Sequence, residues 1–171
     1  MNKASGPPRQ SIPISVAWLG YGGLLPFVAL AVACFTSAEY GSLGRVALIV
    51  YGAVILSFVG ALHWAFAMTL PDLSAAKRNE CFIWSVVPAL LAWPAATLMA
   101  AFAQGVIASF FYSITLAAAL LITGFLTNYM QDVRLARVAA LPLWYLPLRL
   151  RLTAVACVCV AVAGFATRSP S

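Results

Sequence analysis

Five long apolar runs dominate this sequence of 171 residues. They cover Ile14–Thr36, Val46–Leu70, Phe82–Ala103, Val106–Thr127 and the shorter Leu152–Thr167. A helix needs about 20 apolar residues to cross a bilayer, and its backbone groups must be paired within the segment. Only 8% of the residues are charged, whereas a soluble domain carries about 25%. The sequence therefore predicts an all-α integral membrane protein of five transmembrane helices in one bundle, with polar tails at 1–13 and 168–171.

The breaks between the runs carry turn residues. A polar stretch at 37–45 follows the first run, Pro71 and Asp72 end the second, and Gln104 with Gly105 predicts a tight hairpin after the third. The fifth run has 16 residues, about 24 Å of helix. This is short for a hydrocarbon core of about 30 Å, so the last helix is expected either to borrow residues 146–150 or to follow an interfacial segment.

The distribution of lysine and arginine predicts the orientation. One side of the membrane receives eight of them and the other side two, Arg45 and Arg168. The eight are Lys3, Arg9, Lys77, Arg78, Arg134, Arg137, Arg149 and Arg151. By the positive-inside rule the N-terminus is cytoplasmic and the C-terminus lies on the far side. The sequence shows no Arg/Ser-rich amphipathic presequence, which favours a bacterial inner membrane over an imported organelle protein. The first run is too long for a signal peptide and lacks a good cleavage site, so we expect it to be retained.

The second run carries a face of small residues. Gly52, Ala53, Ser57, Gly60 and Ala61 recur at helical spacing, which allows neighbouring helices to approach closely. This helix is therefore expected at the centre of the bundle.

His63, the single histidine, lies in the same run and has two interpretations. It is either a neutral, buried imidazole bonded to a neighbouring helix, or a ligand or proton-transfer group. No cofactor is predicted; a haem would need a second ligand such as Met68 or Met130, and a quinone is compatible with the sequence.

Polar and aromatic residues near the cytoplasmic side form the candidate ligand-binding set. This set comprises His63, Trp64, Asp132, Arg134, Trp144, Tyr145, Arg149 and Arg151. The alternative is a plain interfacial anchor, in which Trp144 and Tyr145 lie in the aromatic belt and Arg149 and Arg151 extend to the lipid headgroups.

The sequence contains no motif typical of a catalytic site or a metal site. It holds four acidic residues and one histidine, and no phosphate-binding loop or paired-cysteine zinc spacing. The four cysteines are interpreted as small apolar packing residues. We therefore predict no catalytic residue and no metal site.

The stretch from Tyr51 to Trp64 resembles the domain of unknown function 3429 family of transmembrane protein 69-like membrane proteins. Residues 19–27, 132–134, 141–145 and 148–153 fit the same family in order and spacing, so the resemblance covers about residues 14–165. The pair Gly60-Ala61 stands where the family usually has two glycines. The resemblance implies five helices and an inner-membrane location, mitochondrial in eukaryotic relatives, and implies no activity.

Three functions remain open at this point. The first is a non-catalytic accessory or assembly component of a larger membrane complex, with lipid and other inner-membrane proteins as partners and no nucleic acid. The second is a binder or carrier of a small lipophilic ligand such as a quinone, porphyrin or lipid, using His63 and the Arg/Trp rim. The third is an enzyme that uses His63 and Asp132 as acid–base groups.

Overall fold

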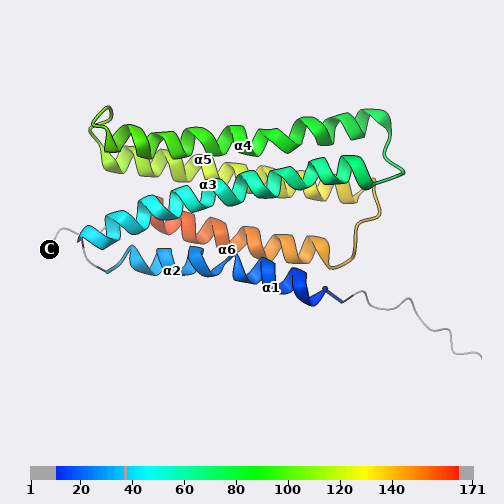
Figure 1. Cartoon of the computed structure of the whole chain (residues 1–171), viewed down its shortest axis with the longest axis horizontal. Helices are drawn as coiled ribbons and strands as arrows, with labels where there is room; N and C mark the ends of the chain where they lie inside the picture. The colour runs from blue at the N-terminus through cyan, green and yellow to red at the C-terminus, as the bar shows by residue number, and fades with distance from the viewer. Residues whose placement is uncertain (1–10, 37, 166–171) are drawn as a thin grey trace, which may run out of the picture.

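A computed structural model describes residues 11–36 and 38–165, without the side chains of Ala38 and Glu39. Its helices are α1 (Ile14–Gly22), α2 (Leu25–Ala33), α3 (Ala38–Thr69), α4 (Ala75–Ala103), α5 (Phe110–Ala136) and α6 (Tyr145–Phe165). Within this part of the chain five segments, with α1 and α2 counted as one, are long and apolar enough to cross a membrane. They lie lengthwise beside one another, with their connections at the two ends (Figure 1). The prediction of an all-α bundle with five spans is confirmed. The tails, apart from residues 11–13, lie outside the described residues.

The first span is broken between α1 and α2. Pro26 stands in the first turn of α2 and has no N–H to donate to the preceding turn. The backbone tightens there, because the N–H of Leu24 bonds to the carbonyl of Tyr21 three residues back. The carbonyl of Gly23 accepts a hydrogen bond of 2.9 Å from the Tyr51 hydroxyl of α3. The break is therefore fixed from the neighbouring helix.

Helix α3 is central, as the sequence predicts, and packs against α2, α4, α5 and α6. Glycines produce its closest approaches. A Cβ atom placed on Gly60 would lie 2.7 Å from a ring carbon of Pro88 in α4, and one on Gly124 of α5 would overlap Leu56. Gly52 faces Leu121 of α5. These contacts explain why one face of α3 needs residues without a side chain.

The remaining small residues of α3 are less enclosed. Ala53 is buried and Ser57 is half-buried, whereas Ala61 is exposed. Ala53 and Ser57 line a shallow groove between α3 and α4 that is open on the bundle surface. The predicted small-residue face thus has two parts. Gly52 and Gly60 are buried against neighbouring helices, whereas Ala53 and Ser57 line the open groove and Ala61 is exposed.

Helix ends differ from the predicted spans in three places. The polar stretch after the first run is the first part of α3, which continues to Thr69, whereas a turn was expected at 37–45. Gly105, with a positive φ of 74°, makes the hairpin after α4, but α5 begins only at Phe110. Helix α6 begins at Tyr145 instead of Leu152, because Pro147 falls in its first turn, where a proline is tolerated. The interfacial segment is consequently short, and α6 reaches about 32 Å, enough for the hydrocarbon core.

Candidate functional site

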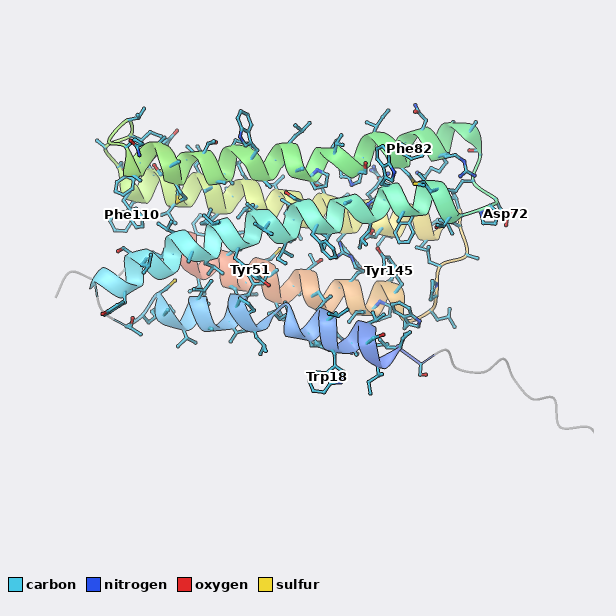
Figure 2. All side chains as sticks on the ribbon, in the orientation of Figure 1. Trp18, Tyr51, Asp72, Phe82, Phe110 and Tyr145 are labelled. Atoms are coloured by element: carbon cyan, nitrogen blue, oxygen red, sulfur yellow. The ribbon has the colours of Figure 1, made fainter. Side chains whose placement is uncertain are left out.

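Four polar side chains from three helices meet near one end of the bundle. They are His63 of α3, Asp132 of α5, and Tyr145 and Arg149 of α6. Each of the first two lies four to six residues before the end of its helix, and Arg149 lies four residues after the start of α6. At 1.5 Å per residue this is about 6–9 Å from the helix ends. Figure 2 shows Tyr145 toward the end of the bundle marked by Asp72, opposite Phe110.

Asp132 is the centre of this charged cluster. Its Oδ2 accepts a hydrogen bond of 2.8 Å from Arg149 Nε, and its Oδ1 accepts one of 3.0 Å from the Tyr145 hydroxyl. His63 Nε2 lies 3.5 Å from the same Oδ1. The exposed fractions of Asp132 and His63 are 1% and 0%, so the carboxylate is enclosed by protein groups.

Aromatic rings close the cluster from the side. Phe66, one turn beyond His63, makes edge-to-face contacts with the imidazole and with the Tyr145 ring, at centroid distances of 6.0 and 5.5 Å. Edge-to-face packing is the favoured geometry for such rings. The charges therefore lie inside protein and not against lipid.

Some buried polar side-chain atoms in and beside the cluster have no hydrogen-bond partner. These are both ring nitrogens of His63, Nδ2 of Asn128 and Nη2 of Arg149. Buried polar atoms are normally paired, and an exception needs a specific explanation. Arg149 is 6% exposed and is the cationic member of this set.

A second polar layer connects α4 to α5 beside the cluster. The Trp84 indole donates to Asn128 Oδ1 at 3.1 Å, and the Gln131 amide donates to Glu80, which also pairs with Lys77 at 2.8 Å. The sequence-based site omitted these residues. Their signal was the spacing of Asn128, Gln131 and Asp132, which places all three on one face of a helix.

A cavity of about 100 Å³ lies beside Arg149. Its wall comes from the α1–α2 break, from α3 and α5, and from α6, where Thr153 and Ala156 contribute with Arg149. Most of the other lining side chains are apolar, and those of Leu19 and Phe58 are exposed, so the cavity reaches the bundle surface between α1 and α3. It thus places one buried cation beside a partly open cavity with mostly apolar walls.

Of the other four predicted site residues, Trp144 contacts the cluster through the ring of Tyr145, and the other three make no contact with it among the interactions described. Trp64 is half-exposed and packs on Phe82 of α4, and Arg134 is exposed. Arg151 is exposed and donates to the Tyr21 hydroxyl of α1 at 3.3 Å. Trp144 is half-buried, and its ring contacts the ring of Tyr145 at a centroid distance of 6.4 Å.

The buried positions of Arg149 and Tyr145 contradict the alternative in which this segment is only an interfacial anchor. Both were expected at the headgroups under it, yet both are buried and turned toward Asp132. The reason is that α6 begins seven residues earlier than predicted, which carries these side chains into the packed part of the bundle.

Metal and haem ligands are not assembled around His63 in the described part of the chain. No group of three His, Cys, Asp or Glu side chains suited to a metal occurs there. Met68 and Met130 are both exposed on the bundle surface. What the arrangement provides chemically is a buried, carboxylate-paired guanidinium whose residue lines a mostly apolar cavity.

Comparison with known proteins gives a family and one relative. The family described as "Protein of unknown function (DUF3429)" matches residues 12–165. Transmembrane protein 69 of Xenopus tropicalis is 37% identical over 141 residues, which cover 82% of this chain and 49% of that protein. The chain thus spans about half the length of this relative. No solved structure matches it.

Proposed function

The chain belongs to the DUF3429 family, and we propose that it is a non-catalytic membrane protein that binds one small lipophilic molecule beside Arg149. An arginine that is 6% exposed and lines a cavity with mostly apolar walls carries this proposal. Ionisable residues inside membrane helices are costly and therefore mark functional sites by default. The bundle surface near Leu19 and Phe58 gives a molecule dissolved in the bilayer a lateral route to this cation.

The size of the cavity restricts the ligand. An engineered cavity of about 150 Å³ in another protein admits benzene. A space of about 100 Å³ suits a slim chain or the end of a ring system and is too small for a porphyrin. His63 does not line this cavity, which argues against haem ligation at the site.

Quantitative extraction of the purified protein tests the proposal. The protein is isolated in mild detergent, and its bound lipophilic molecules are compared by mass spectrometry with the bulk membrane extract. We expect one species enriched to near one equivalent per chain. Bound molecules in the same proportions as the bulk membrane would sink the proposal.

An accessory role in a larger inner-membrane complex is the second candidate. It is supported by the open side of α3, where Ala61 is exposed beside the groove that Ala53 and Ser57 line with α4. Small residues on an outer face let the helix of another protein approach closely. A photo-crosslinking residue at Ala61 should capture one discrete protein, and the same residue at the exposed Val158 should not. Equal or diffuse capture at both positions contradicts this role.

A further inference from the structure

We propose that the hydroxyl of Thr153 is the polar contact of the ligand, and that the ligand is an uncharged lipophile whose carbonyl oxygen accepts a hydrogen bond from it. This inference rests on the proposed binding function and specifies the ligand of the same cavity. Three observations carry it: the unpaired hydroxyl of Thr153, the charge balance beside it and its depth along α6.

The Thr153 side chain is a buried polar group in the wall of the cavity, with an exposed fraction of 4%. Other helical hydroxyls bond to the carbonyl four residues back, as those of Ser57, Thr97 and Thr127 do at 2.7–3.0 Å. The Thr153 hydroxyl makes no hydrogen bond to any group in the described part of the chain. Buried polar groups are normally paired, because an unpaired one is costly to bury.

The Thr153 oxygen borders the cavity instead of being enclosed. The enclosed side-chain atoms that lack a partner belong to His63, Asn128 and Arg149, and the Thr153 oxygen is not among them. It therefore keeps accessible surface, and the space that this residue lines is the cavity. Nη2 of Arg149, by contrast, is enclosed and offers no bond to a molecule in the cavity. Thr153 consequently presents a hydrogen-bond donor to a bound molecule.

The charge balance of the site favours an uncharged ligand. Arg149, one helical turn before Thr153, is paired with Asp132 at 2.8 Å, and both side chains of this pair are almost fully buried. A charged ligand group beside this neutral pair would be buried without a partner, which is strongly unfavourable. A carbonyl oxygen accepts a hydrogen bond from a hydroxyl without adding charge. The group that meets Thr153 is therefore an uncharged oxygen.

The depth of Thr153 restricts the ligand further. Thr153 lies eight residues after Tyr145, the first residue of α6, which is about 12 Å along a helix of about 32 Å. The wall around it is apolar, with Ala156 on the same helix and Ile55 and Val59 on α3. A phosphate or carboxylate stays at the polar surface of the bilayer, whereas a carbonyl on an apolar body can enter to this depth. Isoprenoid quinones and long-chain esters both have this chemistry.

The experiment measures the binding of three defined probes to protein that has been washed free of lipid in detergent. The probes are a short-chain isoprenoid quinone, methyl oleate, and octadecene, a hydrocarbon chain that lacks oxygen. Native mass spectrometry over a series of probe concentrations gives the affinity and the number of molecules bound per chain.

Two sets of variants are compared. Thr153→Val and Thr153→Ala remove the hydroxyl, Thr153→Ser keeps it, and Thr123→Val is the control at an exposed position of α5. Ala156→Leu fills the cavity, and Ala154→Leu is its control at an exposed position of α6. An unchanged unfolding temperature shows that a variant is folded, and either variant without the hydroxyl suffices.

We expect the wild type, Thr153→Ser and both controls to bind one molecule of the quinone or of the ester per chain. Thr153→Val should weaken this binding about threefold to tenfold, as expected for one lost hydrogen bond between neutral groups. The affinity for octadecene should be the same in Thr153→Val and in the wild type, because the hydrocarbon makes no bond to the hydroxyl. The oxygen-bearing probe that responds to Thr153→Val identifies the source of the carbonyl.

Two other results separate the two proposals. Suppose that Thr153→Val leaves the affinity for the quinone and the ester unchanged, or weakens octadecene equally, while Ala156→Leu weakens binding and Ala154→Leu does not. The role of Thr153 is then overturned, and the binding function stays in place. No bound probe in the wild type, or equal binding in Ala156→Leu and Ala154→Leu, overturns both.

Discussion

Arg149 and Asp132 show how a charged pair is accommodated within a membrane-spanning bundle. Each is almost fully buried, and the carboxylate receives donors from Arg149 and Tyr145. A buried pair adds little net stability, but the removal of one partner leaves an uncompensated charge. The pair therefore constrains α5 and α6 to one relative position, with His63 of α3 held against the same oxygen.

The Asp132→Asn substitution should destabilise the protein by about 3–5 kcal/mol, because Arg149 then remains charged and unpaired. The double variant Asp132→Asn with Arg149→Met should recover most of this loss, since no buried charge is left. Thermal unfolding in detergent, followed by circular dichroism, measures both.

The control for this cycle is Arg134→Gln, at an exposed position two residues farther along α5. It should change the free energy of unfolding by less than about 0.5 kcal/mol. If the double variant loses as much free energy of unfolding as Asp132→Asn alone, the pair stabilises the bundle through more than mutual charge neutralisation.

At the scale of helices, glycine contacts determine how closely the elements pack. A Cβ on Gly164 of α6 would overlap the Cβ of Ala118 in α5, and the Gly60–Pro88 contact plays the same part between α3 and α4. Gly22 at the end of α1 has open space around the same hypothetical atom. Substitution of alanine for Gly164 and for Gly22 is therefore expected to have opposite effects on the stability of the bundle.

The Gly164→Ala substitution should destabilise the bundle by about 1–3 kcal/mol, as overpacking does in a closely packed core. Gly22→Ala should be neutral or stabilising, because alanine favours helix by up to about 1 kcal/mol over glycine. Unfolding temperatures of the two variants test the pair. Equal effects would mean that α5 and α6 can separate at no cost.

The end of α3 depends on one arginine of α4. Arg78 donates to the backbone carbonyls of Ala67 and Leu70, which have no partner within their own helix end. Arg78→Gln should therefore speed amide hydrogen exchange in the last turn of α3, corresponding to a loss of about 1 kcal/mol in local stability. Arg137→Gln, at the exposed end of α5, is the matched control and should leave this exchange unchanged.

For the whole molecule, the charge distribution indicates the orientation. Lys77, Arg78, Arg134, Arg137, Arg149 and Arg151 lie toward the end of the bundle that holds the α3–α4 connection. Arg45 lies toward the opposite end, where it donates to the carbonyl of Ala163 near the end of α6. The positive-inside rule therefore predicts that the α3–α4 connection is cytoplasmic and that the α4–α5 hairpin faces the other side.

Cysteine labelling in intact cells tests this orientation. Asp72 and Gln104 are exposed residues in the two connections. A membrane-impermeant maleimide should label the Gln104→Cys variant and spare Asp72→Cys until the membrane is permeabilised. The parent chain reports any reaction of the native cysteines, of which Cys34, Cys81 and Cys159 are buried. The reverse labelling pattern would show that the bundle is inserted the other way round.

The sequence by itself determined the class and number of the spans, because runs of about 20 apolar residues have no other stable arrangement than helices across lipid. It also identified His63, Asp132, Tyr145 and Arg149 as candidates, since polar groups are rare in such runs. It did not predict that only these four of the eight candidates meet, or that Arg149 turns inward. Those outcomes depend on the start of α6 and on the rotation of each helix about its axis. Both are decided by contacts between distant segments, such as Gly60 on Pro88 and Arg149 on Asp132.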